Sequence, residues 1–86
     1  MAIGGCSNEV PDDQLVERNG ITYEVNSQTP FSGSAVRYFK NGQLFDRSNY
    51  KDGKKDGLEE TYYENGQLAY KENYKDGELI SHVSSD

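Results

Sequence analysis

The sequence predicts an all-β protein, an antiparallel meander of β-hairpin repeats that forms a single-layer twisted sheet. Two observations support this fold class. Asn-Gly and Asp-Gly pairs, which suit tight reversals, recur at strand-length intervals along the chain. Residues 33–53 and 57–77 align with an offset of 24 and are identical at 11 of 21 positions, which indicates stacked copies of one small unit.

The tight-turn pairs divide the chain into short extended stretches. Type I′ reversals need a positive φ at both central residues, which Asn-Gly and Asp-Gly tolerate well. Such pairs occur at Asn19-Gly20, Asn41-Gly42, Asp52-Gly53, Asp56-Gly57, Asn65-Gly66 and Asp76-Gly77. The intervals between them predict strands at 14–18, 21–26, 33–40, 43–50, 58–64 and 67–74, with a short one at 78–83. Because turn glycines recur so often from residue 19 to 77, helix is not expected there.

Two-residue turns would also fix which side chains face each other across each hairpin. The expected pairs in the first unit are Phe39 with Leu44, Tyr38 with Phe45, Arg37 with Asp46, and Gly33 with Tyr50. Those in the second unit are Tyr63 with Leu68, Thr61 with Tyr70, Glu59 with Glu72, and Gly57 with Tyr74. The like-charge pair of Glu59 and Glu72 has no explanation in the sequence.

This register predicts one aromatic face. Tyr50 and Tyr74 lie over strand glycines and are interpreted as packing of the sheet itself. The other members are candidate partner-binding residues: Phe39, Leu44, Tyr63, Leu68 and Tyr70. Because a single layer cannot bury both faces, we expect a cover from the N-terminal hairpin, a second copy or a partner.

Composition excludes several classes of function. A net charge of −6 disfavours nucleic acid and anionic lipid as ligands. The single cysteine, Cys6, permits no internal disulfide, and no apolar run approaches the ~20 residues of a membrane span. The acids of the Asp-Gly pairs lack the spacing of known calcium loops, so no metal or other cofactor is expected.

No catalytic constellation is present in the sequence. Glu59 and Glu60 are neighbours on a strand and therefore point to opposite faces. His82 is the sole histidine and is expected to lie in a frayed tail, where it cannot form a nucleophile–base pair with a serine or with Cys6. We therefore expect a protein that is not an enzyme.

The chain divides into three parts by composition. Residues 1–14 are interpreted as a flexible N-terminal tether, 15–80 as the repeat domain, and 81–86 as a disordered tail. Within the tether, Ile3-Gly4-Gly5-Cys6 resembles the end of a bacterial lipoprotein signal, which makes Cys6 a candidate site of lipid attachment. The polar, acidic residues after it fit a tether that lifts a domain off a membrane.

The repeats resemble the MORN-variant family, whose members are often labelled YwqK-type antitoxins. The resemblance is carried by Gly57, Tyr62-Tyr63, Asn65-Gly66-Gln67-Leu68 and Tyr74-Lys75-Asp76-Gly77, and by the equivalent residues of the first unit. It covers about residues 15–79. It implies a MORN-like hairpin array without enzyme chemistry.

These observations predict a non-enzymatic protein-interaction module of the bacterial cell envelope, built as a small lipoprotein. The first alternative is a cytoplasmic, antitoxin-like protein that neutralises a protein partner, and the second is a glycan-binding module. Membrane contact is expected only through a lipid on Cys6. Homo-oligomerisation through the sheet edge or face stays open, with Lys51, Lys54 and Lys55 as candidate guards against edge pairing.

Overall fold

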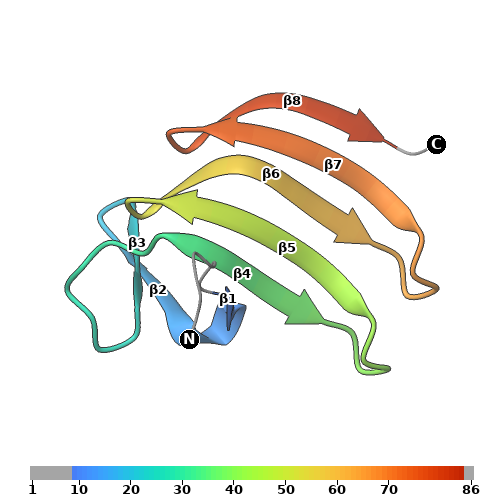
Figure 1. Cartoon of the computed structure of the whole chain (residues 1–86), viewed down its shortest axis with the longest axis horizontal. Helices are drawn as coiled ribbons and strands as arrows, with labels where there is room; N and C mark the ends of the chain where they lie inside the picture. The colour runs from blue at the N-terminus through green and yellow to red at the C-terminus, as the bar shows by residue number, and fades with distance from the viewer. Residues whose placement is uncertain (1–8, 85–86) are drawn as a thin grey trace, which may run out of the picture.

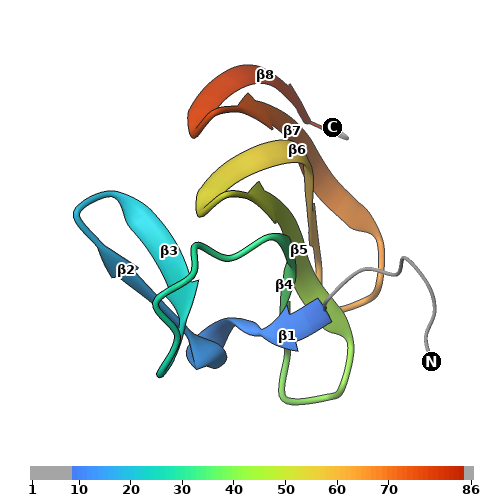
Figure 2. The same cartoon turned by 60° about the vertical axis from the view of Figure 1, so that its left-hand side comes forward.

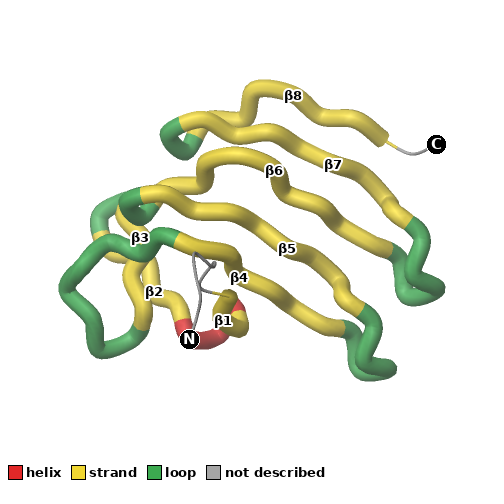
Figure 3. Tube along the Cα trace, viewed as in Figure 1, coloured by secondary structure: helices red, strands yellow, loops and turns green. Residues whose placement is uncertain are grey.

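The computed structural model describes residues 9–84, and within them it contains strands, turns and one short 3₁₀ turn (Figures 1 and 3). The elements in chain order are β1 (Glu9–Pro11), η1 (Asp12–Gln14), β2 (Leu15–Arg18), β3 (Ile21–Glu24), β4 (Gly33–Tyr38), β5 (Leu44–Lys51), β6 (Lys54–Tyr62), β7 (Leu68–Lys75) and β8 (Glu78–Ser84). The predicted all-β fold class is confirmed.

The strands form a six-stranded sheet and a separate two-stranded hairpin. The large sheet has the order β1-β4-β5-β6-β7-β8, and the hairpin pairs β2 with β3. From β4 to β8 each strand is antiparallel to the next, while β1 is parallel to β4. The chain therefore makes the predicted antiparallel meander, as Figure 1 shows.

Both ends of the described chain are more ordered than the sequence predicted. Residues 9–14, expected to belong to the tether, form β1 and η1, and β1 pairs with β4 from Glu9 to Pro11. Glu9 also makes an ion pair of 2.6 Å with Arg47. At the other end, residues 81–84 extend β8 along β7 and are not a frayed tail. Backbone pairing with β4 and β7 thus orders these two segments, although their polar composition suggested disorder.

Three of the predicted two-residue reversals have the expected geometry. Asn19-Gly20, Asp52-Gly53 and Asp76-Gly77 each have two consecutive residues with positive φ, as a type I′ turn requires. Asp56-Gly57 is not a turn, because it lies inside β6, where the pairing with β5 shifts register between Ser48 and Tyr50. Gly57 still has a positive φ of 98° and serves a bulge in the strand.

The two Asn-Gly reversals of the repeats are wider than predicted. The Phe39 amide bonds the Gln43 carbonyl, and the Gly42 amide bonds the Phe39 carbonyl, so three residues separate the closing pair. Gly42 has a φ of 89°, whereas Asn41 is not left-handed and instead accepts a hydrogen bond from the Gln43 amide. The loop from Tyr63 to Gln67 has the same bonds.

This extra loop residue changes the register near each loop. Tyr38 pairs with Leu44 and Tyr62 with Leu68, so the predicted pairs Phe39–Leu44, Tyr38–Phe45 and Tyr63–Leu68 are wrong. A bulge then restores the expected register, and the other predicted pairs are confirmed: Arg37–Asp46, Gly33–Tyr50, Thr61–Tyr70, Glu59–Glu72 and Gly57–Tyr74.

The β2–β3 hairpin folds back onto the β5–β6 turn (Figure 2). Three backbone hydrogen bonds join them: the Thr22 amide donates to the Gly53 carbonyl, the Gly53 amide to the Phe31 carbonyl, and the Phe31 amide to the Thr22 carbonyl. Their N···O distances lie between 2.8 and 2.9 Å. The Phe31 ring is 3% exposed and lies 5.8 Å from the Tyr50 ring. One of the three expected covers, the N-terminal hairpin, is therefore observed over one end of the sheet. The buried apolar side chains of residues 9–84 are few: Phe31, Ala35, Val36 and Ala69.

Replacing Gly53 by alanine tests this attachment. Gly53 and Gly20 have the same φ of 83°, so a side chain at either position costs about 1–2 kcal/mol of backbone strain. A Cβ at Gly53 would in addition press on Ile21 Cγ2 and lie 3.0 Å from the Thr22 carbonyl oxygen, whereas Gly20 has open space. We expect Gly53→Ala to lower the free energy of unfolding by at least about 1 kcal/mol more than Gly20→Ala. Equal losses in urea unfolding would contradict the hairpin contact.

Candidate functional site

The two repeat loops lie side by side and form one end of the sheet, here called the loop end and made of residues 38–45 and 62–68 (Figure 1). The Asn41 side chain donates a hydrogen bond of 3.2 Å to the Glu64 carbonyl, which joins the loops. The Phe39 and Phe45 rings pack at 4.8 Å. Tyr38 and Tyr63 remain 57% and 47% exposed. The loop end therefore presents aromatic surface on a hydrogen-bonded frame.

The structure places four of the five predicted partner-binding residues at the loop end. Phe39, Leu44 and Leu68 are partly buried there, and Tyr63 is exposed. Tyr70 lies farther along β7, opposite Thr61, and its ring packs against His82 at 5.1 Å. Tyr38, which is exposed, was not among the predicted residues, because a two-residue turn pairs it with Phe45, on the side of the sheet opposite Phe39 and Leu44.

Between the loop end and the hairpin, the sheet face carries a row of polar side chains rather than a continuous aromatic surface. We call it the polar row: Arg37, Asp46, Ser48, Lys55, Glu59, Thr61, Glu72 and His82. Asp46, Ser48, Glu59 and Thr61 are buried. Arg37 approaches Asp46 at 3.4 Å, and Lys55 approaches Glu59 at 2.9 Å. Each strand from β4 to β8 contributes to this row.

The polar row explains why Glu59 and Glu72 can lie opposite each other. Glu59 is bound by Lys55, whose ammonium also lies 4.9 Å from the centre of the Tyr74 ring. Glu72 contacts His82 Nδ1 at 2.8 Å and accepts a hydrogen bond of 3.3 Å from the Tyr74 hydroxyl. Each carboxylate thus has its own partners, which offsets their mutual repulsion.

Asp46 and Glu59 form a pair of buried carboxyl groups with opposite pKa shifts. Burial, together with hydrogen bonding to Glu59, raises the pKa of Asp46 from 3.8 to about 6. For Glu59, burial acts to raise the pKa, but hydrogen bonds from Asp46 and Lys55 outweigh it and leave the pKa lowered. Asp46 is therefore the member of the pair that holds a proton first as the pH falls.

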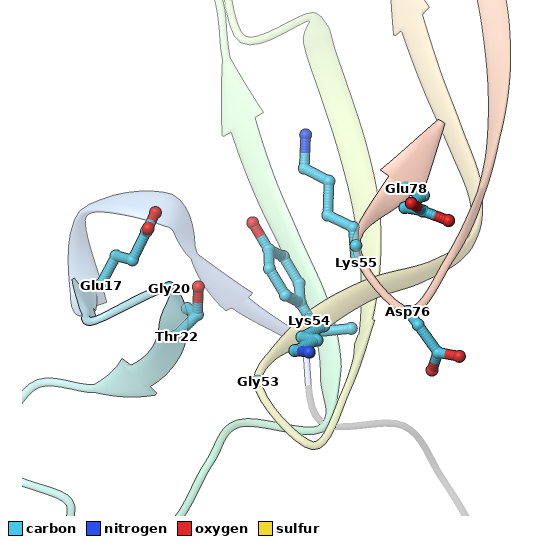
Figure 4. A pocket seen from close by; sticks show the side chains of 10 residues that line it. Glu17, Gly20, Thr22, Gly53, Lys54, Lys55, Asp76 and Glu78 are labelled. Carbon is cyan, nitrogen blue, oxygen red and sulfur yellow. The ribbon is translucent and has the colours of Figure 1, made fainter. Parts of the chain in front are cut away.

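A shallow pocket of about 360 Å³ lies between the β2–β3 hairpin and the sheet (Figure 4). Glu17 and Thr22 line it from the hairpin, and Lys55 and Glu78 from the sheet. Its lining mixes acids with lysines, and Lys55 is already held by Glu59. The lining does not single out one class of ligand.

Other expected sites have these positions. Cys6 lies outside the described residues. The ten predicted turn residues all lie at reversals: Asn19, Gly20, Asn41, Gly42, Asp52, Gly53, Asn65, Gly66, Asp76 and Gly77. Within residues 9–84 no group of three or more His, Cys, Asp or Glu side chains is arranged to hold a metal ion. The same part of the chain has no helix with the length and hydropathy needed to cross a membrane.

Comparison with known proteins identifies the repeats. Residues 32–52 and 55–76 each match the family model described as MORN repeat variant, and together they make up half of the chain. Each matched stretch spans a wide Asn-Gly loop and reaches the Asp of the Asp-Gly turn that follows it. Searches of curated proteins and of solved structures found no match.

The substitution Asp46→Asn tests the carboxyl pair. Because the folded-state pKa of Asp46 lies above 3.8, protonation of its side chain favours folding, and this contribution is lost as the pH rises through about 6. Asparagine stays neutral at every pH. Relative to the wild type, the variant should therefore be more stable at about pH 7.5 than at about pH 4.5, by about 1–2 kcal/mol. A stability difference that does not change between these pH values in urea unfolding would contradict the shift.

Proposed function

The chain belongs to the MORN repeat variant family, and we propose that it is a non-enzymatic protein-interaction module of the bacterial cell envelope, anchored by a lipid on Cys6. MORN repeats are in general non-catalytic modules for contact with proteins or membranes. The proposal assigns the protein contact to the loop end and the membrane contact to the N-terminal lipid.

The observation that carries the protein contact is the exposure of Tyr38 and Tyr63 at the same end of the sheet. Only 33% of the residues are hydrophobic, and few of their side chains are buried, yet Tyr38 and Tyr63 leave 57% and 47% of their surface exposed. Tyrosine combines a large apolar area with a hydroxyl group and is enriched at binding hot spots. The packed Phe39 and Phe45 rings and the Asn41 bond to Glu64 hold the surrounding loops in place, which reduces the entropy lost on docking.

The envelope assignment is supported by the sequence around Cys6. A small residue precedes the cysteine, as in lipoprotein signals, and an acidic polar segment follows it. A single acyl chain binds membranes only weakly, so stable anchoring requires the two chains of a diacyl group. A cytoplasmic antitoxin-like protein would use the same docking surface without the lipid, and this difference separates the two readings.

We expect Tyr63→Ala to weaken the capture of a protein partner from cell extract. Loss of one hot-spot tyrosine costs about 2 kcal/mol or more, so binding should weaken by at least about tenfold. Val25→Ala is a matched control, because Val25 is also 47% exposed but lies in the segment after β3, away from the loop end. Quantitative pull-down with the wild type and both variants measures the effect. Equal capture by the two variants would rule out the loop end, and binding to polysaccharide instead of protein would favour a glycan module.

We expect Cys6→Ser to move the protein from the membrane fraction to the soluble fraction. The wild type, expressed from its natural gene, should incorporate a labelled fatty acid and partition into detergent, because diacylation buries many CH₂ groups at ~0.8 kcal/mol each. The serine variant cannot be acylated at this position and should do neither. If wild type and variant fractionate alike and carry no label, the envelope assignment fails and the cytoplasmic alternative stands.

A further inference from the structure

The two wide loops of the repeats are closely alike in sequence and in backbone geometry. Each contains the tetrapeptide Asn-Gly-Gln-Leu, at 41–44 and at 65–68. Gly42 and Gly66 have φ angles of 89° and 91°, and their amides donate hydrogen bonds of 3.0 and 2.9 Å to the carbonyl three residues earlier. In both loops the asparagine Oδ1 accepts a hydrogen bond of 2.9 Å from the glutamine amide. The two Asn-Gly pairs are therefore matched sites within one chain.

The loops differ in what holds the nitrogen of the asparagine side chain. The Asn41 Nδ2 donates a hydrogen bond of 3.2 Å to the Glu64 carbonyl of the neighbouring loop. Within residues 9–84 the Asn65 Nδ2 has no hydrogen-bond partner, and no further loop of this kind follows it. Both asparagines are exposed to solvent. The carboxamide of Asn41 is thus held at its oxygen and its nitrogen, whereas that of Asn65 is held at its oxygen alone.

An Asn-Gly pair can react within itself, because glycine has no side chain to keep its backbone nitrogen away from the asparagine carboxamide. The glycine nitrogen loses its proton and bonds to the asparagine Cγ. The Cγ–Nδ2 bond breaks, which releases ammonia and leaves a five-membered succinimide ring. Water then opens this ring at either carbonyl carbon and gives aspartate or isoaspartate. The sum is the loss of ammonia and the gain of water, so the reaction needs no other reactant.

Ring closure requires the carboxamide to leave its hydrogen-bond partners, and this cost differs between the loops. The glycine amide and the asparagine Oδ1 must release equivalent bonds in each loop. Asn41 must in addition break its bond to the Glu64 carbonyl. One hydrogen bond of this kind changes an equilibrium by about fivefold, so it protects Asn41 by about this factor.

We propose that Asn65 is a site of spontaneous succinimide formation in the folded protein, and that the contact between the two loops protects Asn41. Conversion of Asn65 exchanges a neutral amide for a carboxylate beside Glu64. The isoaspartate product also adds one carbon atom to the main chain of the loop. Asn65 follows Tyr63 by two residues, so the reaction would alter the docking surface over time, a consequence that rests on the proposed function.

Peptide mapping of the wild-type chain after incubation in mildly alkaline buffer tests the proposal. Cleavage after lysine and arginine places Asn41 in the peptide 41–47 and Asn65 in the peptide 56–71. Conversion is measured as the mass increase from amide to acid, and fragmentation of the second peptide separates Asn65 from Gln67. A second sample incubated in urea gives the ratio of the two rates in the unfolded chain. In the folded chain this ratio should shift by about fivefold in favour of Asn65.

The matched control exchanges the residues that precede the two asparagines, in the variant Lys40→Glu combined with Glu64→Lys. Both side chains are exposed, and the main-chain carbonyl of residue 64 still accepts the Asn41 bond, so the preference for Asn65 should persist. The proposal is overturned by a folded-chain ratio equal to that in urea, by no conversion of Asn65 in the folded chain, or by a preference that passes to Asn41 in the exchange variant. The readout is a mass and needs no binding partner, so its failure and failure of the proposed function are separate results.

Discussion

Backbone reversal at the repeated glycines is the constraint on which this structure depends. The described residues bury only four apolar side chains, so a large hydrophobic core is not what orders the strands. Each reversal instead fixes the register of the next strand, and one of them, at Gly53, also bonds the N-terminal hairpin to the sheet. Main-chain hydrogen bonds between strands therefore contribute more to the order of this structure, relative to side-chain burial, than they do in a domain with two packed layers.

In a sheet built in this way, one end, the loop end, and one edge strand, β8, carry exposed side chains. The polar row occupies the centre of one face, where buried Asp46 and Glu59 are tolerated because Arg37 and Lys55 accompany them. The loop end and β8 carry exposed apolar side chains in two separate places. The proposed contact with a protein partner uses the first of these two places, the loop end.

The sequence predicted the meander because glycine-bearing pairs and the internal repeat report on local backbone geometry. The sequence did not show that the same dipeptide can form two kinds of reversal. Asn19-Gly20 forms a two-residue turn, whereas Asn41-Gly42 lies in a wider loop in which the Asn41 side chain accepts a hydrogen bond from the Gln43 amide. Strand β1 was missed because no turn signals a parallel pairing. The polar row was not predicted because the candidate face was defined by its aromatic residues. Its polar residues could have been placed on one face from their alternate positions, as with Asp46 and Ser48 on β5 and Glu59 and Thr61 on β6.

Residue-resolved amide hydrogen exchange of the wild-type chain tests most directly whether reversals and main-chain pairing order this protein. The structure predicts slow exchange for the Phe39 and Tyr63 amides, which close the wide loops, and for the Thr22 and Gly53 amides, which join the hairpin to the sheet. If the amides of Phe39 and Tyr63 instead exchange as fast as in an unfolded chain, these reversals do not fix the register, and the account of the fold is wrong.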